Sequence, residues 1–467
     1  MSRTHAFRTD DVLLEHDAVG LVELLQRGEV SAPELVDAAI ARAQQVDSAL
    51  GCLALETFDL ARHRARDPKP GFFSGVPTVI KDNVEVAGLP TQQGTDAFVA
   101  KPAQHDGDFA RMYLQTGVIP IGKSRLSEFG FNAAVDHPRL GPVRTPWHEA
   151  HYAGASSAGS AALVASGAIP IAHANDGGGS IRIPASVNGL VGLKPTRDRV
   201  PSDKLSRSMP VRIIADGVLT RTVRDTAAFL RESERIYRNK RLPEVGDVVD
   251  PVHGRLRIAV VTDGIGRSAS PEVEALTLKT AAALEEMGHH VEHIAPPVPA
   301  FFADHFVLYW SMLAMMLVRS GRALAGPSWD PSKLDNVTLG LAKHCERNLH
   351  KLPLAIATLK ASRRGSAQHY QKFHVTLCPT LATQTPEIGF LDPLQTYDEV
   401  MGRLRDWVAF TPLHNATGDP AISLPLATTA AGLPQGMMLS AGYGQDALLL
   451  GLAYALEEAH PWPLVHH

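Results

Sequence analysis

The chain has 467 residues, of which 45% are hydrophobic and 20% are charged, and this balance excludes an intrinsically disordered protein. The formal net charge of −4 gives no sign of the basic surface that nucleic-acid binding requires, so we expect no nucleic-acid partner. Cys52, Cys345 and Cys378 lie too far apart in the sequence for a disulfide framework or a CxxC zinc site.

The N-terminus and the apolar runs predict a cytoplasmic protein without membrane contact. Residues 1–11 lack the apolar core of a signal peptide. The longest apolar run, Val307–Val318, is interrupted only by Ser311 and is shorter than the about 20 residues that a membrane span needs. We interpret His466 and His467 as a tag remnant and leave them out of the argument.

The first half of the chain predicts an α/β fold. Residues 18–46 have helical periodicity in two pieces that are split at Gly28, and Ser31 with Glu34 has the pattern of a capping box. Between Gly75 and Gly192, short apolar runs separated by glycines alternate with helical stretches. The runs are Val76–Ile80, Val118–Ile121 and Ala168–Ala174, and the helical stretches are Asp108–Gln115 and Ser160–Ser166. This alternation favours a buried, largely parallel sheet.

The second half contains further strands and an unusually apolar helix. The charged stretch Arg231–Arg241 predicts a surface excursion. Beyond it we expect a strand over 256–261, a helix over 271–287, a strand over 290–294 and an apolar helix over 301–320 that ends at the turn residues 326–331. Residues 378–467 have strand and loop character around Asn415–Leu426.

Two motif matches fail on their context. Gly117–Ser124 fits the phosphate-loop pattern GxxxxGK[ST], but a helix precedes it and Pro120 removes an amide that would bind phosphate, so we expect a buried strand. His289–His293 fits H-x-x-E-H, but it follows Gly288 and precedes two prolines, which favours a solvated edge strand. We therefore expect neither a nucleotide nor a metal ion at these segments.

A third group of motifs has a joint chemical meaning. Three glycines precede Ser180, and such a tight backbone can direct successive N–H groups at one point, as an oxyanion hole for acyl transfer requires. A serine nucleophile needs a base, but none of the 21 histidines lies in a recognisable context and no S-x-x-K occurs. Lys81 closes an apolar strand, and burial lowers a lysine pKa from about 10.4 toward 7–8, which makes Lys81 a usable base.

These motifs resemble those of the amidase signature enzymes, which hydrolyse carboxamides through a Ser–cis-Ser–Lys triad. The resemblance covers nearly the whole chain, in the segments 75–83, 122–128, 154–196, 217–225 and 420–425. It implies a single large mixed sheet flanked by helices. It also implies one domain over 1–467, with a catalytic core at about 70–230 and a C-terminal half that completes the sheet and the substrate pocket.

The resemblance also implies a role for each residue that matches the family motifs. Ser180 corresponds to the nucleophile, Lys81 to the general base and Ser156 to the serine that links them, after a cis peptide bond at Ala155–Ser156. The family needs neither a cofactor nor a metal ion. The backbone amides of the oxyanion hole correspond to Gly177, Gly178, Gly179 and Ser180, and the supporting side chains to Ser157, Asp176 and Arg182.

The chain departs from the family pattern at a few positions. The usual Gly-Gly-Ser-Ser-Gly-Gly has Ala155 and Ala158 at its second and fifth positions, and Asn175 replaces a frequent threonine. These changes remove no catalytic group, so we expect an active enzyme. The glutamine-acting subunit of the tRNA amidotransferase typically has Gln where this chain has Ile183, which weakens the amidotransferase alternative, a subunit acting with protein partners and tRNA.

Several stretches are closer to stand-alone bacterial amidases, and within these to 6-aminohexanoate cyclic dimer hydrolases. Examples are Asn175-Asp176, Gln384–Gly389 and Asn415–Gly418. We therefore predict hydrolysis of the C–N bond of small amides, of aryl or medium-chain type, by a protein that forms a homodimer, as family members often do. The helix 301–320 is either core or a wall of the acyl pocket. Its large side chains are Phe301, Phe302, Trp310, Met312, Met315 and Met316.

Overall fold

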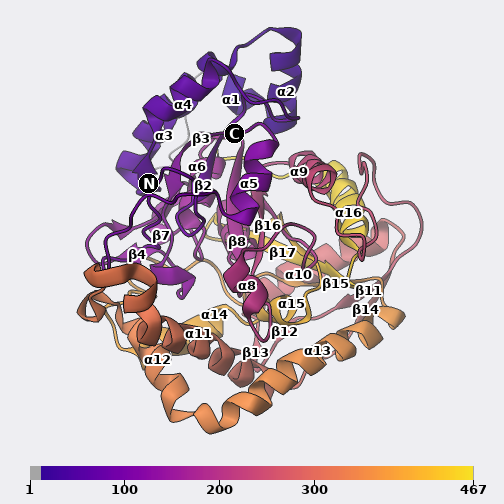
Figure 1. The fold of residues 1–467 in the computed structure, drawn as a ribbon. Helices are drawn as coiled ribbons and strands as arrows, with labels where there is room; N and C mark the ends of the chain where they lie inside the picture. The colour runs from indigo at the N-terminus through magenta and orange to yellow at the C-terminus, as the bar shows by residue number, and fades with distance from the viewer. Residues whose placement is uncertain (1–11, 466–467) are drawn as a thin grey trace.

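The computed structural model describes residues 12–465 (Figure 1). We predicted from residues 1–11 that the chain has no signal peptide, and these residues lie outside the described part of the structure. So do His466 and His467, which were interpreted as a tag remnant.

The centre of the molecule is an eight-stranded mixed sheet, which confirms the predicted fold class. Its strands lie in the order β14-β11-β15-β17-β16-β9-β10-β8. The pairs β14–β11 and β11–β15 are parallel, and all other neighbours are antiparallel. The strands span Ile171–Asp176 (β8), Val191–Lys194 (β9), Ala215–Thr220 (β10), Arg257–Val260 (β11), His290–His293 (β14), Val375–Pro379 (β15), Ala421–Thr428 (β16) and Pro434–Ala441 (β17).

The prediction of a largely parallel sheet from the first half of the chain is wrong. The helical connection between β8 and β9 does leave these two strands pointing the same way, because both are antiparallel to β10. Strand β10, which comes later in the sequence, lies between them, however, so β8 and β9 each pair with β10 in the antiparallel direction and not with each other. Alternation along the sequence reports the connection between two strands, and it does not show which strand lies between them.

A second, three-stranded sheet lies beside β8 and carries Lys81. Strand β3 (Ile119–Ser124) lies between β1 (Leu53–Glu56) and β2 (Pro77–Lys81), antiparallel to β1 and parallel to β2. Strand β2 packs alongside β8, and the backbone N–H of Lys81 donates to Nδ1 of His173 at 3.2 Å. This contact brings the end of β2 next to the end of β8. The short strands are β4 Asp136–His137, β5 Gly141–Pro142, β6 Arg144–Thr145, β7 His148–Tyr152, β12 Asp263–Gly264 and β13 Arg267–Ser268.

The helices at the N-terminus form as the sequence predicts. They are α1 (Val12–Glu15), α2 (Ala18–Arg27), α3 (Ala32–Leu50) and α4 (Phe58–Ala65). Gly28 ends α2 in the left-handed region, with φ of 69°, and Ser31 with Glu34 forms the predicted capping box of α3.

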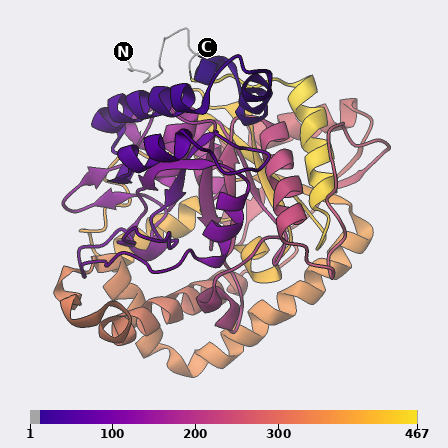
Figure 2. The ribbon, with the colours of Figure 1, turned by 45° about the horizontal axis from the view of Figure 1, so that its top comes forward.

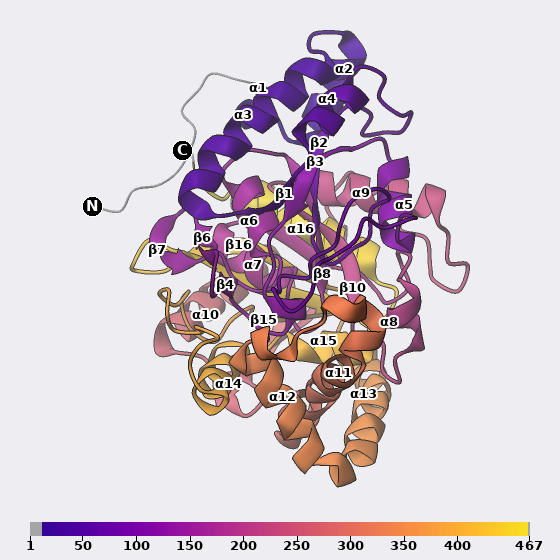
Figure 3. The ribbon, with the colours of Figure 1, turned by 60° about the vertical axis from the view of Figure 1, so that its left-hand side comes forward.

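The remaining helices cover the sheet and build the opposite end of the molecule. Helices α9 and α16 lie side by side (Figure 2), whereas α11 to α14 gather at the end away from α1 to α4 (Figures 1 and 3). The bounds are α5 Asp108–Gln115, α6 Ala158–Ala165, α7 Arg182–Asn188, α8 Lys204–Ser208, α9 Val223–Ile236, α10 Pro271–Glu286, α11 Phe301–Ala325, α12 Asn336–Arg347, α13 Leu352–Lys372, α14 Tyr397–Trp407, α15 Pro412–Thr417 and α16 Asp446–Ala459, with 3₁₀ turns at Glu128–Gly130, Gly326–Ser328, Pro331–Lys333 and Leu349–Lys351.

Several sequence-based assignments need correction. Residues 378–467 are not only strand and loop, because α14, α15 and α16 form there, and α12 and α13 were not predicted. Helix α13 buries only Ala355 and Leu359, so its sequence lacks the apolar stripe by which a helix is recognised. The first half of the charged stretch Arg231–Arg241 is the last part of α9, and not a surface loop.

Helix α11 is longer than its apolar run suggests. The segment Phe301–Ser328 is long and apolar enough to cross a membrane by length and composition alone, so α11 extends well beyond the apolar run Val307–Val318 on which the prediction was based. A core helix passes the same test, and α11 packs against α12 and α13 and contributes Phe302, Tyr309 and Met312 to a buried cluster. The apolar character of α11 is thus used for packing within the protein.

The two rejected motifs adopt the structures that their contexts predict. The phosphate-loop match contains the fully buried strand β3, and Lys123 within it forms an ion pair of 2.7 Å with Asp82. The segment His290–His293 is β14, an exposed strand at the edge of the large sheet. Among residues 12–465, no group of His, Cys, Asp or Glu is arranged to hold a metal ion.

Candidate active site

The predicted catalytic residues come together where β2 and β8 end. Lys81 is the last residue of β2, and Asp176 is the last residue of β8. Ser156 lies in the turn before α6, and Ser180 lies in the turn between β8 and α7. All four side chains are buried, with Ser180 8% exposed. Segments that are separated by up to 99 residues in the sequence thus meet at one point, as the motif analysis expects.

Lys81 is held by three neutral oxygens. Its Nζ donates to Ser156 Oγ at 2.7 Å, to Ser157 Oγ at 2.9 Å and to Asn175 Oδ1 at 2.6 Å. The ammonium group is cut off from water, and burial lowers the pKa of Lys81 to about 7, although Asp216 and Asp176 favour the charged form. A large share of the Lys81 side chains is therefore neutral near pH 7, as a general base requires.

The peptide bond before Ser156 differs from the expectation. Among the described residues no peptide bond is cis, so the cis bond expected at Ala155–Ser156 is wrong for this structure. For a bond that does not precede proline the trans form is favoured by about 3–4 kcal/mol, and the trans form already brings Ser156 Oγ within hydrogen-bond distance of Lys81. Ser180 Oγ accepts a hydrogen bond from the backbone N–H of Ser156 at 3.3 Å.

The turn that carries Ser180 is fixed by a buried ion pair. Arg182 donates to both carboxylate oxygens of Asp176 at 2.9 Å, and both side chains are fully buried. Burial alone would raise the pKa of Asp176, but the guanidinium of Arg182 holds that pKa well below its usual range. Asp176 is therefore a carboxylate, and it anchors the backbone on both sides of Ser180 by accepting from the N–H groups of Gly179 and Ile181.

These anchors change the expected oxyanion hole. The N–H of Gly179 donates to Asp176 Oδ1 at 2.7 Å. This amide is therefore not available to a substrate, contrary to the prediction that Gly179 contributes to the oxyanion hole. Within the described part of the chain, no hydrogen bond involves the N–H of Gly177, Gly178 or Ser180. Gly179 has φ of 140°, and a Cβ there would approach Thr411 Oγ1 to 2.5 Å, so only glycine fits.

Three residues that support the site were not predicted as site residues. Asn415 donates to the backbone oxygen and to Oδ1 of Asp176, both at 2.8 Å, and Thr411 Oγ1 donates to the carbonyl of Gly178 at 2.6 Å. Asn175 was noted as a departure from the family and as part of a stretch close to stand-alone amidases, but not as a site residue, yet its Oδ1 accepts from Lys81. Thr411 and Asn415 lie more than 200 residues away in sequence, and no local pattern connects them with the turn.

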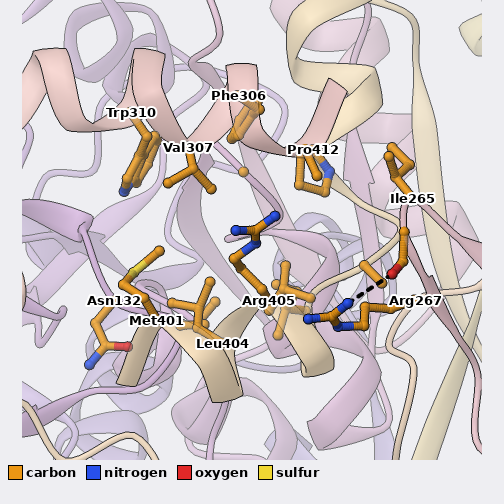
Figure 4. A pocket seen from close by; sticks show the side chains of 18 of the residues that line it. Asn132, Ile265, Arg267, Phe306, Val307, Trp310, Met401, Leu404, Arg405 and Pro412 are labelled. Carbon is orange, nitrogen blue, oxygen red and sulfur yellow. Dashed lines mark hydrogen bonds between the residues drawn. The ribbon is translucent and has the colours of Figure 1, made fainter. Parts of the chain in front are cut away.

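Ser180 is one of the residues that line a pocket, of which Figure 4 shows the labelled side chains. The pocket contains about 960 Å³ of non-atom space, a figure that includes open solvent at its mouth. Helix α11 forms one wall through Phe302, Phe306, Val307 and Trp310. Of the large α11 side chains, Met312 and Met315 are core residues, and Phe301 and Met316 are more than half exposed.

Comparisons with known proteins agree with this geometry. The family model described as Amidase matches residues 34–450. A protein of Mycobacterium tuberculosis assigned as the amidase AmiC is 58% identical over 469 aligned residues, which cover 100% of this chain and 99% of that protein. The substrate complex of a 6-aminohexanoate cyclic dimer hydrolase has a TM-score of 0.88 at 28% identity, covering 98% of this chain and 100% of that one. A bacterial aryl acylamidase of the amidase signature family has a TM-score of 0.85 at 25% identity, covering 97% of each chain.

The mixed sheet flanked by helices, the buried lysine and the two serines of the site fit a hydrolase that acts on amides, and the family match supports that class. The chain belongs to the amidase family, and its fold is that of the amidase signature enzymes.

Proposed function

We propose that the chain is a stand-alone amidase that hydrolyses the C–N bond of small aryl or medium-chain amides through an acyl-enzyme on Ser180. The observation that carries this proposal is the 2.7 Å hydrogen bond between Lys81 Nζ and Ser156 Oγ, formed by a buried lysine whose pKa is about 7. Among the described residues, this lysine is the basic group that contacts the serines of the site.

In the proposed first half-reaction, Ser180 Oγ attacks the amide carbonyl carbon and its proton passes to Ser156 Oγ. Ser156 passes its own proton to neutral Lys81. In the structure Ser180 Oγ accepts a hydrogen bond from the N–H of Ser156. For the proton transfer, the Ser180 side chain must rotate so that its hydroxyl donates to Ser156 Oγ instead. The free N–H groups of Gly177, Gly178 and Ser180 are the donors for the oxyanion.

Acylation is completed when the protons move back, and water then removes the acyl group. Lys81 returns its proton through Ser156 to the nitrogen of the leaving group, the C–N bond breaks and the amine or ammonia departs. Water then attacks the ester carbonyl carbon and gives one proton through Ser156 to Lys81. As the C–O bond to Ser180 breaks, the pair returns this proton to Ser180 Oγ, and the carboxylic acid leaves. Ser157, Asp176 and Arg182 position these groups and do not exchange protons.

The apolar pocket supports the substrate class. Phe131, Phe306, Trp310 and Met401 would surround an aryl or alkyl group, and burial of such a group is the main source of affinity available there. Ile183 also lines this pocket, where the amidotransferase subunit typically has glutamine, so the amidotransferase alternative is not favoured. Two of the relatives, a cyclic amide hydrolase and an aryl acylamidase, are named for acting on amides of this kind.

We further propose a cytoplasmic protein that needs only its small-molecule substrate and that forms a homodimer. The three cysteines are free and buried, as suits a reducing compartment. Size-exclusion chromatography with light scattering tests the dimer, and a monomeric mass would exclude it.

The test of function is release of ammonia or amine by the purified chain alone. The panel runs from acetamide through hexanamide, benzamide and acylanilides to glutamine, with Ser180→Ala as the matched control. We expect turnover of hexanamide, benzamide or the anilides, absent in Ser180→Ala. Turnover of glutamine alone, or turnover only after tRNA and partner subunits are added, would contradict the proposal.

A further inference from the structure

We propose that Arg405 and Arg267 at the pocket bind a carboxylate at the end of the substrate remote from the scissile amide. This inference rests on the proposed function and narrows its substrate class. The preferred substrates are then amides whose apolar body ends in a negatively charged group.

The charge of the pocket lining carries the argument. Of the described residues that line the pocket, only Arg267 and Arg405 are charged, and no aspartate or glutamate is among them. The other lining side chains are apolar except Asn132 and Ser180. Neutral, apolar amides would gain nothing from two guanidinium groups in the pocket lining. A positively charged substrate would be repelled by these groups, whereas a negatively charged one would be attracted.

The two arginines come from different elements and reach toward the same cavity. Arg405 extends from α14 and Arg267 from β13, and both line the pocket together with Phe306, Val307 and Pro412 (Figure 4). Ser180 lines the same pocket. A substrate that reaches Ser180 with its amide can therefore present its far end to the arginines.

Each arginine has donors to spare. Arg405 donates through Nη2 to Asp304, and Arg267 donates through Nε to Asp406 and through Nη1 to the carbonyl of Gly266. Within residues 12–465, Nε and Nη1 of Arg405 and Nη2 of Arg267 are in no hydrogen bond. These N–H groups are the ones that a carboxylate would use, and the planar guanidinium can bind a carboxylate through two parallel hydrogen bonds.

The existing ion pairs do not block this binding. Asp304 and Asp406 do not line the pocket, and their side chains are 64% and 59% exposed. Exposed ion pairs contribute little free energy because water solvates the separated charges nearly as well. A substrate carboxylate whose hydrocarbon part fills the apolar pocket is held close to the arginines, so it can share or replace these partners.

The test is a comparison of matched amide substrates that differ only in their remote end. One series has the charge on the acyl part, as monoanilides of dicarboxylic acids from glutaric to sebacic acid, and a second has it on the amine part, as acyl derivatives of aminobenzoic acids. Each is paired with its neutral methyl ester and with an ammonium analogue. For the best chain length we expect kcat/KM to favour the carboxylate over the ester by about tenfold, a factor that corresponds to about 1.4 kcal/mol.

Variants assign this preference to the arginines. Arg405→Met and Arg267→Met should each lower the carboxylate-to-ester ratio, mainly through KM, and Arg405→Glu should reverse the preference toward the ammonium analogue. Arg319→Met is the matched control, because Arg319 lies on α11 in an exposed ion pair with Glu346 and does not line the pocket. Its ratio should equal that of the wild type. A variant that merely unfolds cannot reverse a preference.

Binding separates this inference from the proposed function. Calorimetry with Ser180→Ala and the same ligands requires no turnover. We expect the carboxylate to bind more tightly than the ester, and we expect this difference to be smaller in the double variant Ser180→Ala, Arg405→Met. If no amide is hydrolysed but this preference appears, the proposed function fails and the inference stands. Equal ratios and equal affinities for carboxylate and ester in both series would overturn the inference.

Discussion

The role that we propose for Lys81 depends on the surroundings of its side chain. Its Nζ contacts two hydroxyls and one amide oxygen, all neutral, so burial removes hydration without supplying a directly contacting carboxylate. By contrast, Lys123 on the neighbouring strand pairs with Asp82 at 2.7 Å. Both lysines close or lie within apolar strands, so the sequence alone does not separate a base from an ion-pair partner. The contacts with Ser156 and Ser157 support our proposal that Lys81 is the base.

The pH profile of the enzyme tests the role of Lys81. Below its pKa of about 7 the lysine holds its proton and cannot accept another, so kcat/KM should fall about tenfold for each pH unit below that value and level off above it. Lys81→Ala should retain the fold and lower kcat by about 10²–10⁴ at neutral pH. Wild-type rates in Lys81→Ala, or a flat profile between pH 5 and about 8, would exclude the proton relay.

At the scale of elements, the turn from β8 to α7 is preorganised by the pair of Asp176 and Arg182. The carboxylate accepts from two backbone N–H groups in addition to the guanidinium, and Arg182 also donates to the carbonyl of Thr411 and to Asn415 Oδ1. The local motif made both charged residues predictable. Their remote partners were not, because contacts across more than 200 residues leave no spacing pattern in the sequence.

Removing the cation of this pair should be costly. Arg182→Met leaves the Asp176 carboxylate buried without its partner, and we expect a loss of about 3–5 kcal/mol in the free energy of unfolding, measured by urea denaturation. Arg212→Met is the matched control, because Arg212 pairs with Asp198 at 2.8 Å but is 36% exposed, and it should cost at most about 1 kcal/mol. Equal losses in the two variants would contradict the view that the turn depends on this pair.

At the scale of the molecule, the site depends on both halves of the chain. Strand β9, which follows α7, pairs on one side with β10 and on the other with β16. Thr411 and Asn415 reach the catalytic turn from the C-terminal half, and α11 and α14 complete the pocket. We therefore propose that the chain folds as one domain and that the catalytic core at about 70–230 is not an independent unit.

Expression of residues 70–230 alone tests this proposal. Without β16 the apolar edge of β9 is unpaired, and without Asn415 the carbonyl of Asp176 loses a buried donor, so we expect a fragment without cooperative unfolding by circular dichroism. The full chain is the control. A soluble fragment with a sharp unfolding transition would show that the core folds without the C-terminal half.

The fold class was predictable because long motifs in a fixed order cover most of the chain and because the strands between Gly75 and Gly192 are apolar and short. The strand order was not, since β10 inserts between β8 and β9 only in three dimensions. Helix α13 was missed because most of its surface is exposed. The positions of Lys81, Ser156 and Ser180 were predicted, whereas the engagement of the Gly179 amide by Asp176 was not, because it depends on the exact path of the turn.

The measurement that tests the central claim most directly is the mass of the protein during turnover. The purified chain is mixed with an acylanilide, quenched in acid within the first turnovers and digested, and the peptides are analysed by mass spectrometry. We predict an added acyl group on the peptide that contains Ser180, absent in Ser180→Ala and no longer present after the substrate is exhausted. Turnover with the acyl group on another residue, or undiminished turnover by Ser180→Ala, would contradict the account.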